Sequence, residues 1–160
     1  MMFKLLLWAQ AISCVVSIKL ECLGVYDRSD AYDRAKLPFL IGTSARIRWA
    51  ELEPTPGSFD WAPFKATFSK AMAAKQCAYV TVLSGPDSPD WLYKSGSVPK
   101  VVPDFSSAKH DKHKKFSQYP YYLDANYKKY YARMITAVAN YFRQSSMGNS
   151  VSFFQVITGR

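Results

Sequence analysis

The sequence predicts an α/β fold in which helices cover a parallel β-sheet. Two observations predict it. β-rich apolar runs and helix-periodic segments follow one another in the order strand, strand, helix, strand, helix, strand, with short links from each helix to the next strand. A complete barrel of eight βα units needs about 250 residues, whereas this chain has 160. We therefore expect a partial (β/α)8 barrel that comprises about the first four βα units.

Each predicted strand is a short apolar run that ends at polar or turn-forming residues. The runs are 20–26, 40–49, 78–83 and 151–157. In the second run Ala45, Ile47 and Trp49 alternate with arginines, and a Pro-Thr-Pro-Gly turn follows. The third run ends at a Ser-Gly-Pro turn, which again favours the end of a strand.

The first predicted helix covers 61–75. Phe64, Phe68, Ala71 and Met72 recur there at the three-and-four spacing of an amphipathic helix, and Asp60 is placed to cap its start.

The second predicted helix has the strongest periodicity in the chain. Its apolar stripe runs from Tyr127 to Phe142, Asp124 can cap it, and Gly148 lies a few residues past its end. We interpret the tyrosines of this stripe as core residues. The connection before this helix, 84–123, has no clear periodicity and far exceeds the usual about 4–6 residues, so we expect a functional βα loop there.

The N-terminus has the pattern of a secretory signal peptide. Lys4 gives a positive start, 5–16 is a mostly apolar run, and Val15, Val16 and Ser17 offer small residues for cleavage. The alternative is a buried first strand or helix. The run is shorter than the about 20 residues that span a bilayer. We therefore expect residues 1–17 to be removed, residues 18–160 to form the N-terminal half of the barrel domain, and the mature protein to be secreted without membrane contact.

The three cysteines have no metal-binding spacing. Once the signal peptide is removed, Cys22 and Cys77 remain and could form a disulfide. We expect two small buried thiols instead, because both cysteines fall in predicted strands that are not neighbours in the expected sheet.

The net charge of +9 is concentrated in one stretch. Segment 94–129 holds eight of the 21 Lys and Arg but three of the 12 acids, and its centre is the block 109–115, KHDKHKK. We interpret this block as a solvated loop. We expect no nucleic-acid partner, since no binding motif accompanies the charge. The spacing of His110 and His113 is compatible with metal binding, but the lysine-rich context argues against a metal site.

One segment carries a family resemblance. Residues 46–61 read RIRWAELEPTPGSFDW. This segment resembles the second-strand region of the (β/α)8 glycoside hydrolases of the β-galactosidase and cellulase superfamily, in which an arginine and a tryptophan precede an "E-P-x-x-G" turn and an aromatic-Asp-aromatic helix start. Residues 89–92, PDWL, match the "P-x-W-L" of the following loop, and 154–156 match the fourth strand.

The resemblance implies a carbohydrate substrate, bound at the C-terminal ends of the strands by Arg48, Trp49, Trp91 and Gln155. Arg48 matches the arginine that keeps the nucleophilic carboxylate ionised in that superfamily. The alternative is an ordinary ion pair of Arg48 with Glu51 or Glu53. The two tryptophan rings suit the CH faces of sugars, and the alternative for each is core packing.

The resemblance implies no catalytic residue within this chain. Retaining enzymes of the superfamily use two glutamates, at the ends of the fourth and seventh strands. Here the fourth strand ends in ITGR, and no seventh strand is present. Glu51 and Glu53 are not expected to be catalysts, because alternate residues of an extended segment point to opposite faces and "E-P" beside a turn stabilises the loop.

The sequence therefore predicts a glycoside hydrolase-like protein whose 160 residues alone are inactive. No P-loop, dinucleotide fingerprint or nucleophile elbow occurs, so we expect no cofactor. Two alternatives remain: a non-catalytic carbohydrate-binding or degenerate relative, and a basic surface-binding module acting through 109–115. Half a barrel also leaves sheet edges open, which predicts self-association if the chain is truly truncated.

Overall fold

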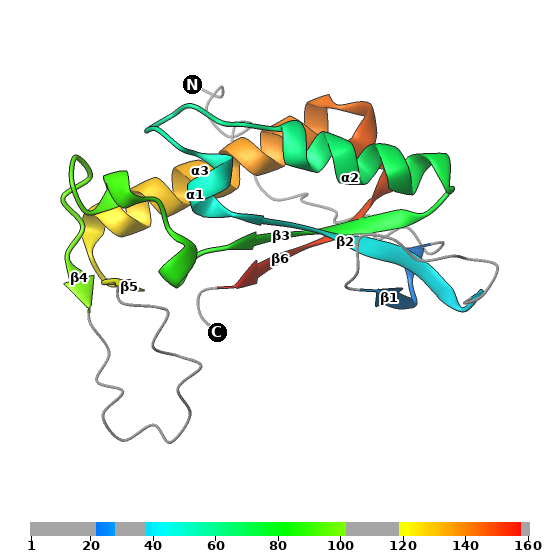
Figure 1. Cartoon of the computed structure of the whole chain (residues 1–160), viewed down its shortest axis with the longest axis horizontal. Coiled ribbons are helices and arrows are strands. Elements are labelled where there is room, and N and C mark those ends of the chain that lie inside the picture. Colours follow the sequence, from blue (N-terminus) through cyan, green and yellow to red (C-terminus); the bar gives the residue numbers. More distant parts are fainter. Residues whose placement is uncertain (1–21, 28–37, 102–118, 158–160) are drawn as a thin grey trace, which may run out of the picture.

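A single parallel sheet organises the computed structural model, which describes residues 22–27, 38–101 and 119–157 (Figure 1). Its strands are β1 (Val25–Asp27), β2 (Leu40–Arg48), β3 (Cys77–Leu83) and β6 (Val151–Ile157). They lie side by side in chain order, and each pairs in parallel with the next. Sequential parallel strands linked through helices are the arrangement of a βα barrel. The barrel is not closed: β1 and β6 form the two edges of the described sheet.

Helices α2 (Ala62–Ala73) and α3 (Ala125–Gln144) cover one face of this sheet (Figure 1). Both follow the predicted segments. The second predicted strand is one residue too long, because β2 ends at Arg48 and Trp49 begins the short helix α1 (Trp49–Leu52). The described helices lack the combination of length and apolar composition needed to cross a membrane.

The start of α3 is fixed by its predicted cap. The Asp124 side chain accepts hydrogen bonds from the backbone N–H groups of Asn126 and Tyr127, at 2.8 and 2.9 Å. These bonds satisfy two of the donors that a helix N-terminus leaves unpaired. Along the helix, Tyr127, Met134, Val138 and Phe142 are the buried positions, as the apolar stripe predicts.

Helix α2 follows its prediction less completely. Phe64, Phe68 and Ala71 are buried, but Met72 is 40% exposed, so the apolar face is narrower than the sequence suggests. Asp60 Oδ1 accepts from the backbone N–H of Ala62 at 2.9 Å, although Trp61 occupies the capping position itself.

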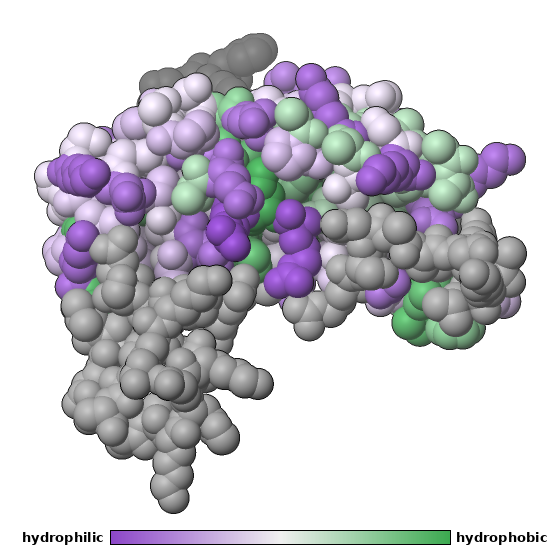
Figure 2. Space-filling view, in the orientation of Figure 1, coloured by the Kyte–Doolittle hydropathy of each residue, from purple (hydrophilic) through white to green (hydrophobic). Residues whose placement is uncertain are grey.

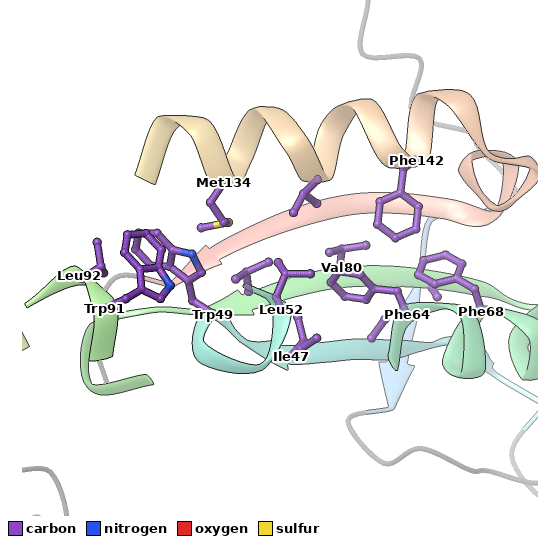
Figure 3. Packing of buried hydrophobic residues seen from close by; sticks show 14 of the residues in the cluster. Ile47, Trp49, Leu52, Phe64, Phe68, Val80, Trp91, Leu92, Met134 and Phe142 are labelled. Atoms are coloured by element: carbon purple, nitrogen blue, oxygen red, sulfur yellow. The ribbon is translucent and has the colours of Figure 1, made fainter. Parts of the chain in front are cut away.

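The hydrophobic core lies between the sheet and the two long helices (Figure 3). Alternate strand residues point into it, as the pleat requires. Burial of one large apolar side chain contributes about 1.5–3 kcal/mol, so this layer supplies most of the favourable free energy of folding. The strands contribute Ala45, Ile47, Ala78, Val80 and Val82, and the helices contribute Leu52, Phe64, Phe68, Met134, Val138 and Phe142.

An aromatic cluster covers part of the opposite face. The rings of Tyr79 and Phe153 stack at 4.8 Å between centroids, and the Tyr26 ring meets both edge-on at 5.5 and 5.6 Å. Tyr26 can approach because Gly42 of β2 has no side chain: a Cβ there would lie 2.5 Å from the Tyr26 ring and 2.3 Å from the Cys77 carbonyl oxygen. Gly42 thus permits the close contact between neighbouring strands.

The two edges of the described sheet expose apolar side chains. On β6, Phe153 and Phe154 are 45% and 47% exposed. At the other edge, Leu23 and Val25 are each 56% exposed, and Figure 2 shows a hydrophobic patch in the region of β1. Elsewhere in that view hydrophilic residues predominate.

The long connection after β3 contains short ordered elements. It passes through the single turns η2 (Gly85–Asp87) and η3 (Asp90–Leu92) to β4 (Lys100–Val101) and β5 (Tyr119–Pro120), which pair antiparallel. This hairpin lies beyond the C-terminal ends of the sheet strands (Figure 1). The turn η5 (Ser146–Ser150) links α3 to β6.

The expectation that Cys22 and Cys77 are separate thiols is wrong, because they form a disulfide with their Cα atoms 5.8 Å apart. Cys22 precedes β1 instead of lying within it, and Cys77 begins β3. A residue outside the strand is not held to the spacing of the sheet. The segment before β1 can therefore reach across the start of β2 to β3.

Other sequence predictions fall outside the described residues. These are the signal peptide 1–17 with Cys14, and the basic block 109–115 with His110 and His113.

The disulfide closes a loop between cysteines 55 residues apart, so its loss is expected to lower stability by about 4 kcal/mol through the entropy of the unfolded chain. Urea unfolding with and without a thiol reductant measures the effect. The double variant Cys22→Ser/Cys77→Ser is the control, and its midpoint should not respond to reductant. Equal midpoints for the oxidised and reduced wild-type protein would contradict the prediction.

Candidate functional site

Arg48 is the last residue of β2, at the C-terminal end of the sheet. Its Nε lies 3.4 Å from Oδ1 of Asp87, a buried carboxylate in η2, and its Nη1 lies 3.7 Å from the exposed Glu51. Its side chain remains 58% exposed. Of the two ion pairs expected as the alternative for Arg48, the one with Glu51 is therefore present. Glu53 pairs instead with Arg133. Because Arg48 is partly fixed and open to solvent, it can meet a carboxylate or a hydroxyl group from outside.

A row of polar side chains crosses the sheet at the position two residues before Arg48 in β2. Arg46, Thr81 and Gln155 are aligned by the parallel register of β2, β3 and β6. They lie on the face opposite the helices, because their neighbours in β2 and β3 point into the core. The Thr81 hydroxyl donates to Gln155 Oε1 at 3.1 Å. The structure therefore places two predicted site residues, Arg48 and Gln155, on one face.

The two predicted tryptophans lie on the other side, in the core. Trp49 is 0% exposed and Trp91 is 8% exposed. Their rings meet edge to face at 6.2 Å, close to Met134 of α3 (Figure 3). The alternative of core packing therefore describes both residues in this structure. Neither ring presents an open face on which a sugar could stack.

Both tryptophans donate an indole N–H hydrogen bond to an oxygen of Glu53. Trp49 Nε1 donates to Glu53 Oε2 at 2.9 Å, and Trp91 Nε1 donates to the Glu53 backbone carbonyl at 2.8 Å. Glu53 Oε1 accepts from the backbone N–H of Gly57 at 2.6 Å and from Arg133. Gly57 has a φ of +81°, a conformation that favours glycine. The carboxylate thus holds the "E-P-x-x-G" turn closed, in keeping with its predicted role in the loop.

Arg133 is the residue that sequence reasoning missed. It extends from α3 to Glu53, which is 0% exposed, and its guanidinium carbon lies 5.4 and 5.1 Å from the ring centroids of Trp91 and Tyr130. A buried carboxylate requires a positive partner. Arg133 lies outside the apolar stripe of α3, and no local pattern in the sequence marks it as the partner of Glu53.

Several tyrosines lie behind this turn, close to the end of β3. Burial raises the pKa of Tyr93 and of Tyr127, and neighbouring tyrosines raise both further. Burial likewise raises the pKa of Tyr131. These groups stay neutral at physiological pH, since an ordinary phenol already ionises only near pH 10. They are suited to donate hydrogen bonds and to pack, not to act as bases.

The residues that the structure describes include no cluster of three or more His, Cys, Asp and Glu side chains able to hold a metal ion. The absence of a cofactor stays a prediction. The chemistry that this end of the sheet offers is recognition of hydroxyl and carboxylate groups by Arg48.

An open parallel sheet in chain order, with an arginine at the end of its second strand, is the arrangement that the resemblance to the (β/α)8 glycoside hydrolases implies. Comparison with protein families gives the family: the model of glycoside hydrolase family 42, described as beta-galactosidase, matches residues 36–155. The chain belongs to this family and has the fold of a partial (β/α)8 barrel, as the resemblance implies. No curated protein matches the chain.

Replacement of the buried carboxylate should destabilise the fold. In Glu53→Gln the amide NH₂ replaces one carboxylate oxygen, so it faces an N–H donor instead of accepting a hydrogen bond from it. Arg133 also loses its counter-charge. The expected loss is about 3 kcal/mol in urea unfolding followed by tryptophan fluorescence. Glu51→Gln is the matched control, because that side chain is 56% exposed and its change should cost less than about 1 kcal/mol. Equal losses in the two variants would rule out the proposed role of Glu53.

Proposed function

We propose that this chain is the substrate-binding half of a glycoside hydrolase that cleaves O-glycosidic bonds by a retaining mechanism. The observation that carries the proposal is Arg48, exposed at the C-terminal end of β2 within the family match. In βα barrels the active site lies at this end. A carbohydrate, with a β-galactoside as the first candidate, is the proposed substrate.

Arg48 is suited to hold a carboxylate in its ionised form. A guanidinium remains charged at any physiological pH and offers several donors in a fixed plane. Asp87 restrains it from the Nε side at 3.4 Å, and this contact limits the orientations of the terminal nitrogens. In the proposed enzyme these nitrogens stabilise the nucleophilic carboxylate and contact a substrate hydroxyl.

The catalytic glutamates are proposed to lie outside this chain. A retaining enzyme places its acid/base and its nucleophile about 5 Å apart, with both reaching the sugar. Glu53 is buried and occupied by Trp49, Gly57 and Arg133. Glu51 and Asp87 both pair with Arg48 near the ends of β2 and β3, whereas the resemblance assigns the catalytic glutamates to the ends of the fourth and seventh strands. No glutamate follows β6 in the sequence.

The purified 160-residue chain is therefore expected not to hydrolyse nitrophenyl β-galactoside or related nitrophenyl glycosides above the buffer rate. Release of nitrophenol is the measurement, and a family member with both glutamates serves as the positive control. Turnover by the chain that survives repurification and is lost in Arg48→Ala would overturn the assignment of the glutamates.

We also propose that the protein is secreted, with residues 1–17 as the signal peptide. The Cys22–Cys77 disulfide supports this proposal, because disulfides persist in oxidising compartments. Expression in a secreting host tests it: the product in the medium should begin at Ile18. Retention of the whole product in the cytosol, with Met1 or Met2 at its N-terminus, would refute it.

A further inference from the structure

We propose that Tyr121 and Tyr122 form a platform on which sugar rings of the substrate stack, outside the end of the sheet. The inference rests on the proposed function, since it assumes a carbohydrate ligand. It assigns substrate contact to the connection after β3, in place of the buried Trp49 and Trp91.

The first argument is exposure. Tyr121 and Tyr122 are 45% and 37% exposed, and the adjacent Leu123 is 67% exposed. Val101, across the β4–β5 hairpin, is 42% exposed. Trp49, Trp91 and Tyr127 at the same end are buried, and the neighbouring tyrosines directly after η3, in β5 and in α3 are half-buried. A continuous group of exposed apolar side chains beside polar neighbours is typical of a binding surface.

The second argument is rigidity. The Tyr121 backbone N–H donates to the Pro99 carbonyl at 2.9 Å, and its carbonyl accepts from the Asp124 N–H at 3.0 Å. Asp124 in turn caps α3, which fixes the segment to the longest helix of the structure. The Tyr122 ring meets the buried Tyr127 ring edge-on at 5.4 Å. A platform held in place before binding loses little conformational entropy when a ligand arrives.

The third argument is position. Strand β5, which immediately precedes Tyr121, lies against η2. Asp87 of η2 is the residue that pairs with Arg48. The platform and Arg48 are thus connected through one short turn and lie at the same end of the sheet (Figure 1). A glycan held at Arg48 could extend onto the two tyrosines.

The fourth argument is chemistry. Flat rings with one polar edge suit the CH faces and hydroxyls of sugars. The described charges nearby are of both signs: Lys100 lies 5.0 Å from the Tyr93 ring centroid, and Lys128 and Lys129 follow on α3. Of the acids, Asp87 pairs with Arg48, Asp124 caps α3 and Asp90 lies in η3. Because the rings are flat and the surrounding charges are of both signs, the platform suits a neutral glycan, and we assign it to a glycan chain rather than to a second copy of the protein.

Affinity electrophoresis of the full chain tests the assignment, with soluble β-galactan, xylan and pectic polysaccharide in the gel. The wild-type protein should be retarded by at least one of them. Tyr121→Ala/Tyr122→Ala should weaken that binding about tenfold or more, whereas Tyr121→Phe/Tyr122→Phe should keep most of it. The matched control is Phe39→Ala, an aromatic residue 61% exposed next to the opposite end of β2, and it should bind as wild type does.

The outcomes separate the two proposals. Failure of the wild-type protein to bind any of the glycans would count against carbohydrate as the substrate and thus against the proposed function. Wild-type binding that the double alanine variant retains would overturn the platform alone. Sedimentation of the same variants tests the alternative that a second copy of the protein binds the two tyrosines. If the alanine changes convert an oligomer to a monomer and leave glycan binding intact, the tyrosines form a contact between copies and the platform is overturned. Unfolding midpoints show that each variant is folded.

Discussion

The buried carboxylate of Glu53 is the constraint on which the arrangement of this end of the molecule depends. Its two oxygens bind Trp49 of α1, Gly57 of the adjacent turn and Arg133 of the distant helix α3. The backbone carbonyl of the same residue accepts from Trp91 in the connection after β3. A charge with no exposed surface is tolerated only where each oxygen has donors. The loops that leave β2 and β3 are therefore fixed together with the core. Arg48 lies five residues before Glu53, so its backbone is held by the same fixed segment.

The two faces of the sheet differ in chemical character. Within each strand alternate residues, such as Ile47 in β2 and Val80 in β3, pack beneath the helices. The intervening residues Arg46, Thr81 and Gln155 form a polar row on the other face. This division follows from the pleat alone. The same alternation places Trp49, the residue after Arg48, on the covered side of the sheet. The chain enters the short helix α1 at this residue, and the ring lies in the core.

Local patterns predicted the fold well and the site only in part. The sequence predicts the apolar stripe that ends at Phe142 and the helix cap at Asp124, because each depends on residues only a few positions apart. The motif around Trp49 does not decide whether that side chain is buried, since the same residues suit a cleft or a core. The partnership of Arg133 with Glu53 spans 80 residues, and the disulfide of Cys22 depends on a strand that begins later than expected. Neither leaves a local signature.

The disulfide also changes the connectivity of the molecule. Because it joins Cys22 to Cys77, the backbone from the start of β1 to the start of β3 forms a covalent ring that contains all of β2 and α2. A protease that cuts once within this ring leaves no free fragment: both new ends remain attached through the sulfur bridge. A nicked molecule can therefore keep its three strands in register, and only reduction releases the pieces. Such a ring extends the time for which a cleaved copy of the molecule holds its shape.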